Sequence, residues 1–268
     1  MRKLERAGLD NLWHVSERIY SGAQPNGDEA FANLRKLGVE TIVSVDGARP
    51  NVEAARKAGL RYIHVPIGYD GISQQAGASL ARVVKEIRGS IYIHCHHGRH
   101  RAPAAAAVAS IVDGGVDDPR RILEVAGTSP RYTGLWRDVA AYQPPPHDSN
   151  LPALVEVAEI ESLTAAMAKI DRIADNLSLC RNAKWEIPAD HPDVVAEEQA
   201  LLLKESFREA ARNVPPDQST QLKEWLTAAE ATAAALENSL VDGRFDEATR
   251  LLVKTTQDCR RCHEKHRN

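Results

Sequence analysis

The chain has 268 residues, of which 43% are hydrophobic and 26% are charged, and its formal net charge is −3. This length leaves room for two cores, and the composition is that of a globular protein. The small negative charge gives no basic footprint for a nucleic-acid partner, and no apolar run of about eighteen residues could span a membrane. The four cysteines, Cys95, Cys180, Cys259 and Cys262, are too few and too scattered for a disulfide framework.

The first 142 residues predict alternating strands and helices. Extended residues at 11–23 come first, and helical spacing then alternates with β-branched or apolar runs. Helices are predicted at 27–37, 51–58 and 79–87, and strands at 39–45, 60–67 and 91–95. Three further helices are predicted at 102–112, 118–126 and 133–142. This alternation predicts a mainly parallel central sheet with flanking helices on both faces.

The run from Ile91 to Pro103 predicts a strand, a tight loop and a helix. Cys95 ends the strand, five residues separate it from Arg101, and Pro103 suits the first turn of a helix. Such a loop turns its backbone N–H groups inward above a helix N-terminus, which favours an anion and the thiolate form of a cysteine. Arg101 adds a planar, two-pronged donor for phosphate oxygens. The pattern predicts attack of a thiolate on phosphorus and a phosphocysteine that water later hydrolyses.

The spacing of His94, Cys95 and Arg101 resembles the signature of cysteine-dependent protein tyrosine and dual-specificity phosphatases, over roughly residues 12 to 142. The resemblance implies that Cys95 is the nucleophile and that Arg101 binds the phosphate. It also implies a set of substrate-binding loop residues, which are His96, His97, Gly98, Arg99 and His100. The family usually has Ser or Thr after the arginine to help the thiolate leave, whereas this chain has Ala102. The resemblance therefore leaves two outcomes open, slow turnover and a binding-only role.

The same family uses an aspartate, on a loop before the catalytic strand, as general acid for the leaving oxygen. Asp70 lies in such a loop, about twenty-five residues before Cys95. A protonated carboxyl there would protonate the departing alkoxide or phenoxide. Asp46, in another turn at the end of a strand, is the alternative.

A proline-rich linker at 143–152 separates a first domain at 1–142 from a second at 153–268, because consecutive prolines stop a helix and stiffen the chain. Beyond the linker every ordered segment has helical spacing. Helices are predicted at 154–179, 194–214, 218–240 and 245–266, the third capped by Asp217 or Ser219. The expected fold is an α/β phosphatase-like domain followed by an all-α four-helix bundle.

The last of these helices contains Cys259-Arg260-Arg261-Cys262-His263. This is the attachment sequence of c-type haem, in which Cys259 and Cys262 bond the porphyrin and His263 ligates the iron. All three side chains face one side of a helix. With Arg267 one turn further on, the segment 151–268 resembles the cytochrome c-prime family. The resemblance implies haem c, a small gas ligand or an electron-transfer partner, and Met167 as candidate sixth ligand.

Other outcomes stay open for the second domain. Zinc is the alternative cofactor, with Cys259, Cys262, His263 and His266 as ligands. A homodimer through the helices is also open. Haem attachment implies a periplasmic or otherwise extracytoplasmic location, reached with a signal peptide that this sequence does not show, whereas a chain without haem would be cytoplasmic.

The sequence thus predicts a hydrolase of phosphomonoesters, of unknown substrate class, fused to a haem domain for redox or gas sensing. The alternative is a haem electron-transfer or gas-binding protein whose first domain only binds phosphate or a partner.

Overall fold

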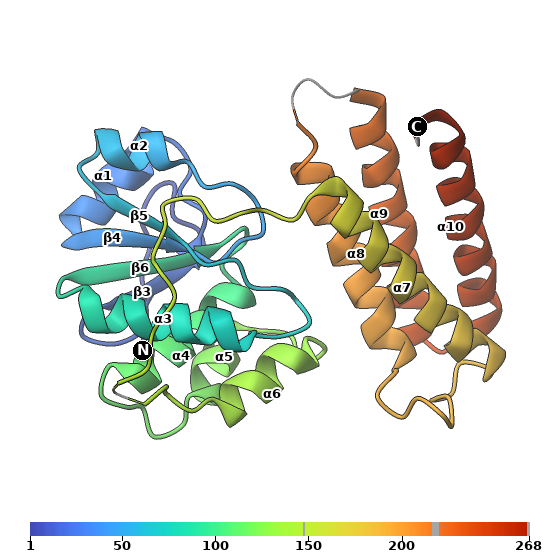
Figure 1. The fold of residues 1–268 in the computed structure, drawn as a ribbon, viewed down its shortest axis with the longest axis horizontal. Coiled ribbons are helices and arrows are strands. Elements are labelled where there is room, and N and C mark those ends of the chain that lie inside the picture. Colours follow the sequence, from blue (N-terminus) through green and yellow to red (C-terminus); the bar gives the residue numbers. More distant parts are fainter. Residues whose placement is uncertain (147, 216–219, 267–268) are drawn as a thin grey trace. The chain divides into compact units, whose positions relative to one another are not determined.

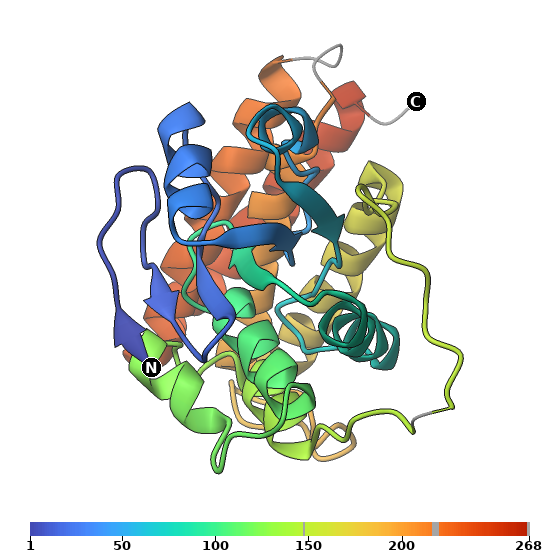
Figure 2. The same ribbon diagram turned by 90° about the vertical axis from the view of Figure 1, so that its left-hand side faces the viewer.

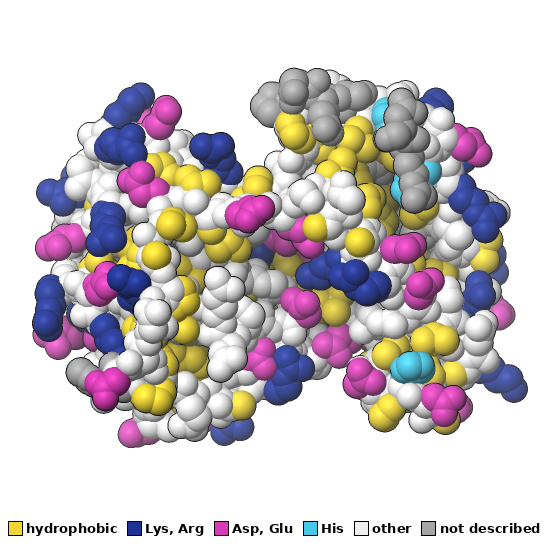
Figure 3. Space-filling view, in the orientation of Figure 1, with side chains coloured by type: hydrophobic (Ala, Val, Ile, Leu, Met, Phe, Trp, Pro, Cys, Tyr) yellow, Lys and Arg dark blue, Asp and Glu magenta, His cyan; other side chains and the backbone are white. Residues whose placement is uncertain are grey.

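The computed structural model describes residues 1–146, 148–215 and 220–266. The chain divides into two compact units, Met1–Ile160 and Glu161–Asn268. No described helix is both long and apolar enough to cross a bilayer. Basic and acidic side chains are mixed on the visible face of each unit (Figure 3). The predicted cap at Asp217 or Ser219, and also His147 and Arg267, lie outside the described residues.

A six-stranded sheet forms the centre of the first unit, in the order β1-β2-β3-β6-β4-β5. Its strands are β1 (Arg2–Lys3), β2 (Trp13–His14), β3 (Ile19–Ala23), β4 (Val39–Ser44), β5 (Arg61–His64) and β6 (Ser90–Cys95). The strands β3, β6, β4 and β5 are parallel, whereas β1 and β2 are antiparallel additions at one edge. The predicted mainly parallel sheet is confirmed, but the sheet is mixed because the first residues of the chain pair with β2.

Helices cover both faces of this sheet. They are α1 (Asp28–Lys36), α2 (Val52–Lys57), α3 (Gln74–Glu86), α4 (Arg101–Val112), α5 (Arg120–Ala126) and α6 (Thr133–Ala141). In Figure 1, α1 and α2 lie on one face and α3 to α6 on the other. Helix α3 begins before the predicted residue 79, because the Ser73 hydroxyl accepts a hydrogen bond from the Ala76 N–H at 3.2 Å and caps the helix earlier.

Within the first unit, an extended segment after α6 packs on α3 and β5, and we call its residues 151–158 the strap. Arg82 of α3 donates to the carbonyls of Leu151 and Pro152, at 2.9 and 3.0 Å. The backbone N–H of His64 on β5 donates to the carbonyl of Val155 at 2.9 Å. Figure 2 shows the segment running past α3. The helix predicted from residue 154 is therefore wrong at its start, because these backbone groups bond to α3 and β5 instead.

The second unit is helical. Its helices are α7 (Leu163–Asn182), α8 (Ala196–Arg212), α9 (Thr220–Val241) and α10 (Phe245–His266). Helix α7 begins at Leu163 because the Ser162 hydroxyl accepts from the Ala165 N–H at 3.2 Å. Helix α9 packs along α8 and α10, and α7 packs along α8 (Figure 1). A C-terminal helical region is therefore present, while its description as a four-helix bundle stays a prediction.

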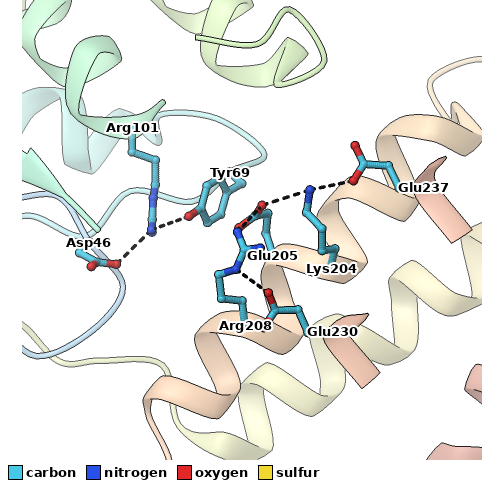
Figure 4. Close-up of polar contacts among 8 residues, drawn as sticks. All are labelled: Asp46, Tyr69, Arg101, Lys204, Glu205, Arg208, Glu230 and Glu237. Carbon is cyan, nitrogen blue, oxygen red and sulfur yellow. Dashed lines mark hydrogen bonds and ion pairs between the residues drawn. The ribbon is translucent and has the colours of Figure 1, made fainter. Parts of the chain in front are cut away.

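Five charged side chains form a network between α8 and α9 (Figure 4). Lys204 lies 2.7 Å from Glu237, and Arg208 contacts Glu205 at 2.8 Å and Glu230 at 2.7 Å. The side chains of Glu205 and Glu237 are only 2% and 4% exposed. Removing one partner of such a buried pair leaves an uncompensated charge and costs about 3–5 kcal/mol. The network therefore ties the two helices together at one relative register.

Candidate active site

The parallel strands end at one edge of the sheet, and the segments that follow them form the candidate site. Ala23 at the end of β3 pairs with Cys95 at the end of β6. Ser44 of β4 pairs with His94 of β6 on one side and with His64 of β5 on the other. The loops that follow all four strands therefore meet at the carboxyl edge, where parallel sheets bind their ligands.

Residues 95–100 form a tight loop between β6 and α4, as the sequence predicts. Cys95 is the last residue of the strand and is 4% exposed. Gly98 has a φ of +68°, and a Cβ atom at this position would overlap the backbone of Gly22 and Ala23. Both its backbone conformation and this close approach require glycine.

Three carbonyl groups of the loop accept hydrogen bonds from residues that do not belong to the loop. The pairs are Gln24 N–H to His96 O at 3.2 Å, Asn11 Nδ2 to His97 O at 2.8 Å and Thr128 Oγ1 to Arg99 O at 2.7 Å. Described peptide bonds are all trans, so each of these carbonyls points opposite to the N–H of the next residue. The N–H groups of residues 97, 98 and 100 therefore point away from these three partners, which is the arrangement expected of a loop that binds an anion.

The Arg101 side chain is completely buried at the carboxyl edge (Figure 4). Its Nη2 donates to Asp46 Oδ1 at 3.0 Å and to the Tyr69 hydroxyl at 2.8 Å. Nη1 donates to the carbonyl of Ile67 at 3.2 Å, and the guanidinium carbon lies 4.0 Å from the centre of the Tyr69 ring. A buried guanidinium needs such partners to offset its lost hydration. Its predicted contact with a phosphate stays a prediction.

A second pair of buried side chains, Tyr62 and His94, contacts the backbone of Cys95. The Tyr62 hydroxyl lies 2.5 Å from His94 Nε2, and His94 Nδ1 lies 3.3 Å from the carbonyl of Cys95. Burial, helped by the negative charge of Asp46, holds the pKa of Tyr62 far above its usual value. The hydroxyl therefore stays protonated and can donate a hydrogen bond to His94 Nε2. Because a carbonyl can only accept, Nδ1 carries the hydrogen that bonds to the Cys95 carbonyl.

Asp70 lies in the loop after β5 and is exposed. Helix α6 holds this loop, because Asp138 Oδ2 accepts from the Ile72 N–H at 2.7 Å and Arg137 Nη2 lies 3.5 Å from the Asp70 carbonyl. Gly134 allows the approach, since a Cβ atom there would overlap the Asp70 carbonyl. The alternative acid, Asp46, is 2% exposed and bonded to the buried arginine instead.

An open cavity of about 1040 Å³ lies beside the loop. Four of the five predicted substrate-binding residues line it, namely His96, His97, Arg99 and His100. Its opposite wall comes from the N-terminal segment and includes Lys3, Glu5, Arg6 and Asp10. Cys95 and Arg101 are not among its lining residues. The cavity can therefore hold the part of a substrate that extends beyond the reacting group, with charged side chains of both signs around it.

The predicted haem residues lie near the end of α10. Cys259 and Cys262 are half-buried free thiols three residues apart on one face of the helix, and His263 is exposed. Burial raises the pKa of the Cys259 thiol, and the nearby Cys262, Asp258 and Asp171 raise it further. Since Asp171 belongs to α7, this face of α10 looks toward α7. Met167, one turn before Asp171, is half-buried on that helix.

The alternative zinc set stays a prediction. Among residues 1–146, 148–215 and 220–266, no three or more His, Cys, Asp or Glu side chains converge as a metal would need. Burial also raises the pKa of Cys262.

The sheet, the loop after β6 and helix α4 together define a phosphatase-like α/β domain. Among curated proteins, the dual specificity protein phosphatase TpbA of Pseudomonas aeruginosa (strain UCBPP-PA14) is 28% identical over 187 residues, which cover 68% of this chain and 78% of that protein. The first unit thus resembles the dual-specificity phosphatases.

Two further comparisons give shorter or weaker matches. A β-lactamase hydrolase-like protein of Xylella fastidiosa (strain 9a5c) is 30% identical over 142 residues, which are 49% of this chain and 32% of that protein. The chain therefore spans about a third of the length of this relative. The crystal structure of P. aeruginosa TpbA matches 51% of this chain and 91% of its own, with a TM-score of 0.41 and 24% identity. No family model matches the chain. The cytochrome c-prime resemblance of the second unit stays a prediction.

Proposed function

We propose that the first unit hydrolyses phosphomonoesters through a phosphocysteine. The observation that carries this proposal is the loop at 95–100, which joins the buried Cys95 to the N-terminus of α4. Three of its carbonyls bond to other segments, so the N–H groups that follow them point away from those segments. Arg101, held at the same edge by Asp46 and Tyr69, supplies a cation beside the loop. The resemblance to a dual specificity protein phosphatase supports the same chemistry.

In the proposed reaction the Cys95 thiolate attacks phosphorus, and the bond from phosphorus to the leaving oxygen breaks as the S–P bond forms. Asp70 gives its proton to the leaving oxygen. Water then attacks the phosphocysteine, which releases phosphate and restores the thiolate. The loop N–H groups and Arg101 stabilise the negative charge on the phosphoryl oxygens throughout. The four loop side chains that line the adjacent cavity contact the rest of the substrate.

The direct test is release of inorganic phosphate by the full chain from an aryl phosphate and from a phosphotyrosine peptide. Release is expected at one or more pH values between roughly 5 and 8. No release at any pH in this range would favour the binding-only alternative.

The variant Asp70→Asn is expected to lower kcat by about 10²-fold for an alkyl phosphate and by less for an aryl phosphate, because a good leaving group needs no proton. The wild-type rate should fall at high pH, where the acid has lost its proton, and this fall should vanish in the variant. Both effects are read from pH–rate profiles with the two substrates. The control is Asp46→Asn, which disturbs Arg101 and should slow both substrates equally. If Asp46→Asn rather than Asp70→Asn removes the fall, the two roles are exchanged.

Ala102 carries a second prediction. It is completely buried in the first turn of α4, directly after Arg101, and offers no hydroxyl to the departing thiolate. We expect Ala102→Ser to speed hydrolysis of the phosphocysteine by about tenfold, since one hydrogen bond to a charged group is worth about 1.5–3 kcal/mol. The measurement is kcat with an aryl phosphate, for which this second step limits the rate. Ala104→Ser, equally buried on the same helix, should give no gain.

We further propose that the second unit carries haem c on Cys259, Cys262 and His263, and that the protein works in the periplasm or otherwise outside the cytoplasm. Two free, half-buried thiols on one helical face, with His263 beside the second, fit this cofactor. Haem bound there would supply an iron for electron transfer or for binding a small gas. Equal phosphate release by ferric, ferrous and gas-bound protein would count against a sensing role.

The alternative function is a haem protein whose first unit binds phosphate or a partner without turnover. The observation that favours it is the absence of a hydroxyl at the buried Ala102. Tight binding of phosphate together with no hydrolysis of any aryl phosphate would support this alternative.

A further inference from the structure

Hydrogen bonds connect the strap to Arg101 by way of His64. The His64 ring is buried at the end of β5, and its Nδ1 accepts from the N–H of Ala158 at 3.2 Å. Its Nε2 lies 2.8 Å from the carbonyl oxygen of Asp46. The carboxylate of Asp46 in turn accepts from Arg101 Nη2 at 3.0 Å. Every step of this path lies within the first unit.

The two backbone partners fix the state of the His64 ring. A backbone N–H can only donate and a carbonyl can only accept, so Nδ1 must be unprotonated and Nε2 must carry the hydrogen. Burial lowers the pKa of His64, and this outweighs the opposing effects of the Asp46 carbonyl and charge. The neutral ring therefore bonds both partners at neutral pH, and gaining a proton on Nδ1 would break the bond to Ala158.

Further hydrogen bonds hold the backbone of His64 and of Asp46, the two residues in the middle of this path. The N–H of His64 donates to the carbonyl of Val155 in the strap, so the strap fixes the backbone as well as the ring. The N–H of Asp46 lies 3.4 Å from the Ser44 hydroxyl. Hydrogen bonds therefore hold the peptide groups on both sides of Asp46, whose carboxylate bonds to the arginine.

We propose that His64 is a positioning residue for Arg101, and that the strap is part of the device that positions it. This inference rests on the proposed function, because it takes Arg101 as the residue that binds phosphate. A displacement of about 1 Å in such a group can cost about 10²-fold in rate. Residue 160 leads into the second unit, so the strap is the segment through which the chain passes from this hydrogen-bonded path into that unit.

The test is the affinity of the full chain for inorganic phosphate, measured by titration calorimetry, which needs no turnover. His64→Leu is expected to weaken phosphate binding by about tenfold, because leucine can form neither of the two hydrogen bonds that the His64 ring makes. His64→Gln should recover about half of this loss on a logarithmic scale, since its amide nitrogen reaches the position of Nε2 and can donate to Asp46. His64→Asn, whose shorter amide can accept from Ala158 but does not reach Asp46, should recover less than His64→Gln.

Matched variants separate positioning from general destabilisation. Ile63→Ala truncates a buried side chain on the opposite face of β5, and should lower the melting temperature while leaving phosphate affinity unchanged. Ala158→Pro removes only the N–H that bonds His64 Nδ1, and should weaken binding by about threefold. Glu159→Pro, at the next and exposed position, should have no effect on affinity.

Each result decides a separate claim. Wild-type phosphate affinity in His64→Leu, or equal losses in His64→Gln and His64→Leu, would overturn the positioning role. Equal affinity of Ala158→Pro and wild type would remove the strap from the device. Wild-type protein that binds phosphate but hydrolyses no aryl phosphate would overturn the proposed function and leave this inference standing. Wild-type protein that binds no phosphate would overturn both.

Discussion

Replacing Cys95 by serine is expected to abolish phosphate release, with a loss of at least about 10³-fold in kcat. The change replaces one atom at a position that is 4% exposed, so the fold and the phosphate-binding loop should persist. The loss comes from chemistry, because a serine hydroxyl stays protonated at neutral pH and is a far weaker nucleophile than a thiolate. The measurement is phosphate release from an aryl phosphate, together with the affinity for inorganic phosphate, which should change little.

The matched control is Cys180→Ser in α7. Cys180 is completely buried, and its Sγ lies 3.8 Å from the carbonyl of Val194, far along the chain from the loop. Full activity of this variant would show that removing a thiol is harmless in itself. Rapid denaturation during turnover should trap phosphorylated protein from wild type and not from Cys95→Ser. If Cys95→Ser keeps more than about a tenth of the activity, the thiolate is not the nucleophile.

Local patterns in the sequence predicted the strand, loop and helix around Cys95. Gly98 could be placed in the loop because its positive φ suits glycine, but the close approach of Gly22 and Ala23 depends on the fold. The sequence placed Arg101 beside the loop, but it did not predict which residues bond to its side chain. Asp46 and Tyr69 follow two other strands, and only the parallel register of β4, β5 and β6 brings them to the arginine.

The polar residues on β5 also escaped prediction. Tyr62 and His64 alternate with apolar neighbours, and both resemble ordinary residues of a buried strand. The signal that could have found them is two polar side chains, two positions apart, on a strand that ends beside the catalytic loop. The start of α7 was misplaced for a related reason. Residues 154–162 have helical spacing, but bonds from β5 to the strap hold their first part in an extended form.

The burial of Glu205 and Glu237 in the second unit could not be predicted from the sequence. Carboxylates are almost never fully buried unless they are paired. Their partners lie three residues away in Arg208 and on the facing helix in Lys204, and helix pairing cannot be read from one sequence. Helix α10, in contrast, begins and ends at the predicted residues, Phe245 and His266.

Haem attachment is the prediction for the second unit with the largest expected effect. The full chain, fused to an export signal and made in a host that attaches c-type haem, should be coloured and heavier by the mass of one haem. The double variant Cys259→Ala/Cys262→Ala should lose the covalent haem completely, because both thioether bonds need these thiols. Each single variant should keep one thioether bond and show a shifted absorbance band. The measurements are the intact mass after denaturation and the visible spectrum.

Cys180→Ala is the control, because its thiol is buried among α7 residues and outside the attachment sequence, and it should keep haem at the wild-type level. Met167→Ala tests the sixth ligand separately. A changed spectrum with unchanged mass would assign Met167 to the iron, whereas an unchanged spectrum would leave it as a packing residue of α7. Colourless wild-type protein from the same host would reject haem, and with it the argument from haem for a location outside the cytoplasm. The phosphatase proposal would be untouched by that result, because the loop at 95–100 is built entirely from residues of the first unit.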